Sequence, residues 1–80
     1  MIDGHVVKNL REALGETQTA FANRFGVGQP TIFKWERDGI KTRFAATAMQ
    51  KLLDDPEAKA AIKAKAKRDK AAAKAAQATA

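Results

Sequence analysis

The chain has 80 residues, of which 15 are Lys or Arg and nine are Asp or Glu, so its formal net charge is +6 and its isoelectric point is near 10. This length allows one small domain without a deep pocket, and the absence of cysteine excludes disulfides and thiolate chemistry. No apolar run approaches the ~20 residues that a membrane span needs, and the N-terminus lacks the features of a signal peptide, so we expect a cytoplasmic protein.

The positive charge is concentrated in the C-terminal part of the chain. Residues 56–80 hold seven basic and two acidic side chains, whereas residues 1–55 are almost neutral. A basic chain favours a polyanionic partner such as nucleic acid. For residues 1–55, however, net charge gives no such indication, and any prediction of DNA binding has to come from the pattern of residues.

The first predicted helix covers residues 4–14. Asp3 is a suitable N-cap, and Gly15 lies just beyond the last turn, where a helix commonly ends in a left-handed residue. We expect His5 at the surface of the first turn without a function, because no second ligand or partner carboxylate lies at a useful spacing. The apolar residues recur at helical spacing and should close a small core. They are Val7, Leu10 and Leu14.

Two short helices that meet at a glycine turn are predicted next. Thr17 is a suitable N-cap of the first, and Gly26 follows it at a position that glycine adopts without strain. Gly28 can cap the second helix and Pro30 fits its first turn, although Pro30 also allows the boundary to fall at Gln29. Two helices joined by a three-residue turn that contains Gly form a helix-turn-helix. Its expected core side chains are Phe21, Ala22, Phe25, Ile32 and Trp35.

A further helix is predicted over residues 43–53, after a break at Asp38 and Gly39 and a short connector. Asp55 and Pro56 end this helix and start another, because Pro suits the first helical position and Asp the cap before it. The apolar residues of the helix should form one stripe with a second row beside it. The stripe is Phe44, Ala48 and Leu52, and the second row is Ala45, Met49 and Leu53.

The segment that follows is of low complexity and is dominated by Ala and Lys, both of which favour helix. Its only large apolar residue is Ile62, so we expect the helix to fray beyond about Ala66. Five lysines keep to one quarter of the helix circumference, where they can follow a phosphate backbone or form a solvated face. They are Lys59, Lys63, Lys67, Lys70 and Lys74. We therefore divide the chain into a domain of residues 1–55 and a basic, helical or partly disordered extension of residues 56–80.

Counted from Gln18, four positions match a known motif: the small residue Ala22, the turn residue Gly26, and the apolar residues Ile32 and Trp35. In these positions the stretch resembles the helix-turn-helix of the Cro and phage-repressor family, also called the XRE family. The resemblance covers roughly residues 6–53. It implies an all-α fold, a small lambda-repressor-like bundle of about four or five helices, followed by the Ala/Lys-rich helix or tail.

Two further features strengthen the resemblance. Gln18 and Gln29 are 11 residues apart, the spacing at which several repressors of the family place one glutamine on a phosphate and the other on a base. The family also pairs an Arg of the first helix with a Glu near the end of the recognition helix, here Arg11 and Glu36. Such an ion pair fixes the placement of two helices. Because Ser, Cys and Tyr are absent and nothing else forms a catalytic constellation, we expect no enzyme, cofactor or metal site.

The implied DNA surface has base-contacting and phosphate-contacting residues. Gln29 is expected to bind adenine and Lys34 to bind guanine, whereas Pro30 and Phe33 offer apolar surface to thymine methyl groups. Phe33 can alternatively pack against a neighbouring helix or a second subunit. The expected phosphate-contacting residues are Thr17, Gln18, Thr31, Arg37, Lys41 and Arg43.

The sequence thus favours a sequence-specific transcriptional regulator that binds double-stranded operator DNA as a homodimer and acts as a repressor in a bacterial or phage-infected cell. Two alternatives stay open. One is an antitoxin-like module that binds a protein partner and regulates its own gene. The other is a nucleoid-associated protein that binds DNA independently of sequence through its lysine-rich tail.

Overall fold

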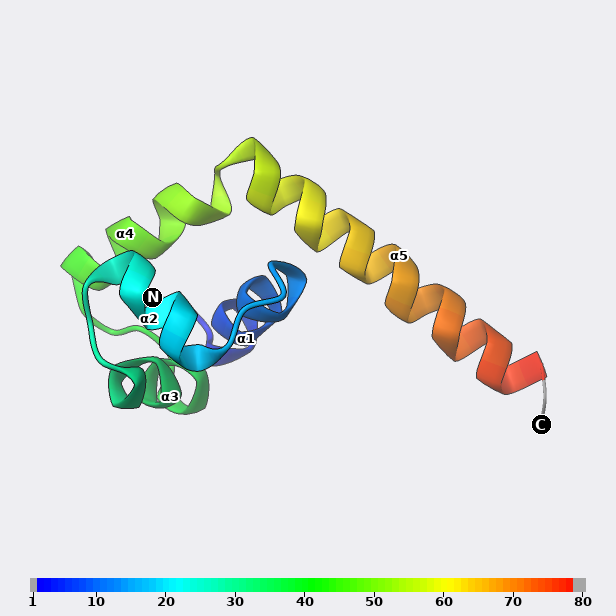
Figure 1. Cartoon of the computed structure of the whole chain (residues 1–80), viewed down its shortest axis with the longest axis horizontal. Helices are drawn as coiled ribbons and strands as arrows, with labels where there is room; N and C mark the ends of the chain where they lie inside the picture. The colour runs from blue at the N-terminus through cyan, green and yellow to red at the C-terminus, as the bar shows by residue number, and fades with distance from the viewer. Residues whose placement is uncertain (1, 79–80) are drawn as a thin grey trace.

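The computed structural model describes the backbone of residues 2–78 and the side chains of residues 2–70 (Figure 1). These residues form five helices and no sheet, which confirms the predicted all-α fold. The helices are α1 (Gly4–Ala13), α2 (Gln18–Phe25), α3 (Gln29–Asp38), α4 (Arg43–Leu53) and α5 (Pro56–Ala78). Helices α1 to α4 gather into a bundle, and α5 leads away from it (Figure 1).

The helix ends lie where local sequence signals predict them. The Asp3 carboxylate accepts a hydrogen bond of 2.7 Å from the backbone N–H of His5, and the Thr17 hydroxyl oxygen accepts one of 3.1 Å from that of Ala20. Gly26 ends α2 in the left-handed conformation, with φ of 65°. Gly28 is the N-cap of α3, so the helix begins with Gln29 and Pro30 lies in its first turn, where no hydrogen bond is lost.

The core lies between α1, α2 and α3, and α4 and α5 close it. Phe25 joins α2 to α3, because its ring meets those of Phe21 and Trp35 edge to face, with centroids 5.1 and 5.9 Å apart. This aromatic set is part of the core, as predicted. The fully buried apolar residues are Val7, Leu10, Phe21, Ala22, Ile32, Ile40, Met49 and Ala58.

The N-terminal segment is fastened to the end of α3, which the sequence analysis did not predict. Ile2 and Ile40 form an isolated antiparallel bridge, with N–H to oxygen distances of 3.1 and 2.8 Å. Gly4 packs directly against the α3 backbone, where a Cβ atom would overlap the carbonyl oxygen of Glu36. These contacts hold α1 against α3 and bury Ile40, which had been assigned to a simple connector.

The prediction for α4 is right in its bounds and wrong for one side chain. Phe44 was expected on the apolar stripe, but its side chain is 90% exposed. The core side of the helix is centred on Met49, which is fully buried. Five residues at ~100° each place Phe44 about 140° away from Met49, on the outer face. The helix instead contributes partly buried residues to the core, namely Ala45, Ala46, Leu52 and Leu53.

Helix α5 begins as part of the bundle and then leaves it. Its first turns pack against α1 and α4, with Ala58 fully buried and Ile62 partly buried. Ile62 was predicted as the anchor, whereas the burial of Ala58 was not foreseen. The helix continues to Ala78. The lysines at 59, 63, 67 and 70 are exposed, and Lys74 lies outside the described side chains. The division of the chain at residue 55 stays a prediction.

Candidate nucleic-acid interface

Helices α2 and α3 form a helix-turn-helix with a fixed turn. The N–H groups of Gly26 and Val27 donate to the carbonyl oxygens of Asn23 and Ala22, at 3.3 and 3.1 Å, and so satisfy the last turn of α2. Val27 also packs against the core. The turn therefore sets the angle between the two helices through backbone bonds and one apolar contact.

Helix α3 has one face toward the core and one toward solvent. Ile32 is buried and Trp35 is half-buried, and together they define the inner face. The four residues predicted to contact bases are all exposed, so α3 presents them on its outer surface. They are Gln29, Pro30, Phe33 and Lys34. None of the four is part of the core, so this face is accessible, as a helix that enters a DNA groove requires.

Arg11 and Glu36, the residues predicted to pair, join α1 to the end of α3. Arg11 Nε donates to Glu36 Oε2 at 2.6 Å and Nη2 to Oε1 at 3.2 Å, and Nη1 donates to the carbonyl oxygen of Glu16 at 2.9 Å. The two side chains are only 15% and 8% exposed. The hydrogen bond to Glu36 raises the pKa of Arg11 above its ordinary value. A two-pronged pair with this burial fixes the position of α3 on α1.

Two glutamines connect this ion pair to the exposed surface of α3. Gln18 Nε2 donates to Glu36 Oε1 at 3.3 Å, and Gln29 Nε2 donates to Gln18 Oε1 at 2.6 Å. Hydrogen bonds thus run from Arg11 in α1 through Glu36 and Gln18 to Gln29 at the start of α3. In the sequence, the ion pair and the two glutamines are separate features. The 11-residue spacing was a signal for the second bond, but no sequence signal indicated the bond between Gln18 and Glu36.

Arg37, a charged residue of the α3 surface, has partners of its own. Arg37 forms an exposed ion pair with Asp38 at 2.9 Å, and its guanidinium lies 5.8 Å from the centroid of the Phe33 ring. The hydrogen bond with Arg37 lowers the pKa of Asp38, and the same bond raises the pKa of Arg37. The pair uses Nε and Nη2 of Arg37 and partly neutralises the charge of its guanidinium.

The remaining predicted phosphate contacts lie in separate places. Thr31, Lys34 and Lys41 line one shallow depression at the junction of α3 and the α3–α4 connector. Arg43 lies in another depression, beside the exposed ring of Phe44 on the outer face of α4. Thr17 and Gln18 begin α2, where the Thr17 hydroxyl already accepts a backbone hydrogen bond. The structure thus brings Thr31 and Lys41 to one depression and places Arg43 in a different one.

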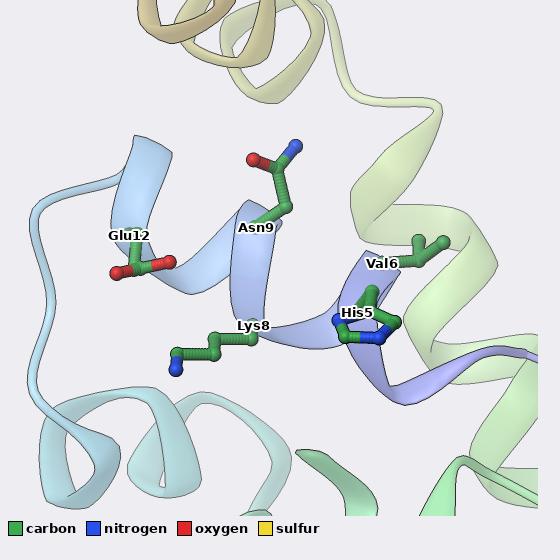
Figure 2. A pocket seen from close by; sticks show the side chains of 5 residues that line it. All are labelled: His5, Val6, Lys8, Asn9 and Glu12. Atoms are coloured by element: carbon green, nitrogen blue, oxygen red, sulfur yellow. The ribbon is translucent and has the colours of Figure 1, made fainter. Parts of the chain in front are cut away.

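A depression on the outer side of α1 has no comparable arrangement. Figure 2 shows that its five lining side chains spread in different directions from the helix instead of meeting at one point. Among the residues that the structure describes, no group of three or more His, Cys, Asp or Glu side chains can hold a metal ion. None of the described helices is both long enough and apolar enough to cross a membrane. The residues of the α1 depression are His5, Val6, Lys8, Asn9 and Glu12.

A family model described as Helix-turn-helix matches residues 7–55, which is more than half of the chain and contains α2, α3, α4 and most of α1. Searches of curated proteins and of solved structures give no significant match. The matched family is one of DNA-binding regulatory domains and not of enzymes. The chain therefore belongs to the Cro/C1-type helix-turn-helix family, also called the XRE family, and is a DNA-binding helix-turn-helix regulator.

Proposed function

We propose that the protein is a sequence-specific transcriptional repressor of phage-repressor type, which binds operator DNA as a homodimer and represses by occupying a promoter. The observation that carries this proposal is the row of hydrogen bonds from Arg11 to Gln29. These bonds hold the Gln29 amide in a defined position on the exposed face of α3. Ordering an exposed side chain costs conformational entropy, and a role in binding accounts for this cost.

In this proposal α3 lies in the major groove and the four exposed residues contact bases. Gln29 binds adenine through the free part of its amide, and Lys34 binds the acceptor atoms of guanine. The Pro30 ring and the exposed Phe33 ring pack against thymine methyl groups. Since the core uses Ile32 and Trp35, these four residues project from the opposite side of the helix.

Phosphate contacts flank the base contacts. The N–H groups that open α2 lack helical partners and favour an anion, and Gln18 stands beside them. Lys41 extends the surface beyond the end of α3. These residues set affinity and orientation, and they carry no sequence information directly. The proposed phosphate-contacting set is Thr17, Gln18, Thr31, Arg37, Lys41 and Arg43.

A homodimer follows from the small size of this surface. One recognition helix contacts only a few base pairs, and helix-turn-helix proteins gain specificity from two half-sites about one helical turn apart. The exposed ring of Phe44 lies on a face of α4 that the bundle does not cover. Two copies on a palindromic operator double the number of base contacts.

Selection of bound sequences from random duplex DNA tests the proposal. We expect a motif with two half-sites, and we expect Gln29→Ala and Lys34→Ala each to relax preference at one base pair per half-site. Lys8→Ala is the matched control for Lys34→Ala, because Lys8 is an exposed lysine of α1 outside the proposed surface. If both α3 variants weaken selected and scrambled duplexes equally, α3 does not select the sequence.

A second candidate is sequence-independent DNA binding through α5. The observation in its favour is the exposed row of lysines at 59, 63, 67 and 70 on a helix that leaves the bundle. Deletion of residues 67–80 separates the two functions. It lowers affinity for every duplex alike if α5 is the main DNA contact, because half of the exposed row of lysines is lost, and it leaves the preference for the selected motif intact if α3 is.

A further inference from the structure

We infer that Glu36 is a specificity-determining residue of the DNA surface, because it fixes which way round the amide groups of Gln18 and Gln29 stand and so makes the surface prefer adenine to guanine. This inference rests on the proposed function and deepens it. Glu36 does not itself face the DNA. Its side chain is only 8% exposed and is held by Arg11, so it acts as a positioning residue.

The first step concerns the direction of the bond between Glu36 and Gln18. A glutamine amide can rotate by half a turn, which exchanges its oxygen and its NH₂ group with little change in shape. The Glu36 carboxylate forms an ion pair with Arg11, and an ionised carboxylate only accepts hydrogen bonds. Gln18 must therefore turn its NH₂ group toward Glu36, as the 3.3 Å bond from Nε2 to Oε1 shows.

The second step transfers this direction to Gln29. With its NH₂ group toward Glu36, Gln18 presents its oxygen to Gln29, and only the NH₂ group of Gln29 can bond to that oxygen. The bond from Gln29 Nε2 to Gln18 Oε1 is 2.6 Å long. Gln29 is exposed, so one N–H and the carbonyl oxygen of its amide stay available to a base. A single acceptor-only residue thus fixes the direction of both amides.

The third step is the match with a base edge. In the major groove adenine offers one acceptor, N7, and one donor, the N6 amino group, whereas guanine offers two acceptors, N7 and O6. The available donor and acceptor of Gln29 match adenine. Against guanine the Gln29 oxygen faces O6, and two acceptors without a hydrogen between them repel each other. If the amide were free to turn, its NH₂ group could donate to guanine, and the preference would fall.

Two variants separate this role from a structural one. Glu36→Gln keeps the shape of the side chain but can both donate and accept, so it no longer imposes a direction on Gln18. Arg11→Gln is the matched control. It removes the other charge of the same ion pair but keeps the Glu36 carboxylate. Both variants loosen α1 from α3, and both are measured at a temperature at which circular dichroism shows them folded.

The first measurement uses the full chain labelled with ¹⁵N, without DNA. In the unmodified protein and in Arg11→Gln, we expect the side-chain amide signals of Gln18 and Gln29 to be shifted from those of free glutamine and to exchange slowly with water. In Glu36→Gln, we expect both sets of signals to move toward free glutamine. Unchanged Gln29 signals in Glu36→Gln would overturn the inference, whatever the protein does with DNA.

The second measurement uses a duplex selected from random DNA by the unmodified protein. The base pair of interest is the one at which Gln29→Ala loses its preference. There we expect the unmodified protein and Arg11→Gln to bind the A·T duplex about 10-fold more tightly than the G·C duplex, and Glu36→Gln about 2-fold. Full preference in Glu36→Gln overturns the inference. If no duplex is selected, or no base pair depends on Gln29, the proposed function itself fails, and the amide signals alone decide whether Glu36 directs the two glutamines.

Discussion

The helix-turn-helix bundle and helix α5 are built on opposite physical principles. Residues 1–55 carry almost no net charge, and their geometry is fixed by core packing, a mostly buried ion pair and a backbone bridge. Helix α5 begins on the bundle, then leads away from it, and exposes a row of lysines. Preference for a sequence and affinity that depends on salt can therefore reside in separate parts of a DNA-binding protein. We propose that the bundle supplies preference for a sequence and that α5 supplies affinity that depends on salt.

Glu36→Ala tests most strongly whether the mostly buried ion pair holds the bundle together. Loss of the carboxylate leaves the guanidinium of Arg11 mostly buried without its partner, and we expect the free energy of unfolding to fall by about 3 kcal/mol. Urea denaturation measures the change. Glu16→Ala is the control, because the pair of Glu16 with Arg24 is partly exposed and its loss should cost at most about 1 kcal/mol. Equal costs for the two variants would show that the buried pair does not hold the scaffold.

Gly4→Ala tests whether α1 must lie directly on the end of α3. The added methyl group overlaps backbone atoms of Glu36, which cannot move aside as a side chain can, so we expect a loss of about 1–3 kcal/mol. Gly28→Ala is the control, since the nearest atom to its Cβ is 3.5 Å away and only the N-cap is altered. Denaturation midpoints that are the same for the two variants would contradict the close approach of the helices.

Deletion of residues 67–80 tests whether the distal part of α5 supplies affinity that depends on salt. We expect stability to change little, because Ala58 and Ile62 stay in place. For each phosphate contact that is lost, the slope of log affinity against log salt should fall by ~0.9, without a change in sequence preference. Binding to the selected duplex over a salt series checks this. An unchanged slope would mean that the distal part of α5 does not contact DNA.

The smallest expected effect concerns Arg37, whose guanidinium forms an ion pair with the neighbouring Asp38. Asp38→Asn should free Arg37 for a phosphate, tighten DNA binding a few-fold and steepen its salt dependence. The pair also has a defined pH dependence. Arg37 lowers the pKa of Asp38 from its ordinary 3.8, so the contribution to stability is present above that pH and is lost as the pH falls through the lowered value. Weaker binding by Asp38→Asn would show that Asp38 itself is needed at the surface.

Local signals were sufficient to predict most of the fold. Caps and breakers act within a few residues, and so Asp3, Thr17, Gly26 and Pro56 predicted helix ends from the chain alone. The family resemblance added the pair of Arg11 and Glu36, which no local rule connects.

Several features that depend on tertiary contact were not predicted. The bridge between Ile2 and Ile40 and the burial of Ala58 arise only when distant segments meet, and a small or isolated apolar residue gives no signal of this. Phe44 was assigned to the apolar stripe because its spacing places it beside Ala48 and Leu52, although the core side of the helix is the one that carries Met49. The hydrogen bond from Gln18 to Glu36 was not predicted, because it joins α2 to α3 and the angle between these helices cannot be inferred from the sequence.

The division of labour between bundle and α5 is tested most directly by one set of binding measurements. The unmodified protein, Gln29→Ala and the chain without residues 67–80 are each titrated with the selected and the scrambled duplex over a salt series. We predict that Gln29→Ala loses preference between the duplexes and keeps the salt slope, and that the shortened chain keeps its preference and loses slope. If the shortened chain loses the preference, or Gln29→Ala keeps it, the bundle is not the part of the molecule that selects the sequence.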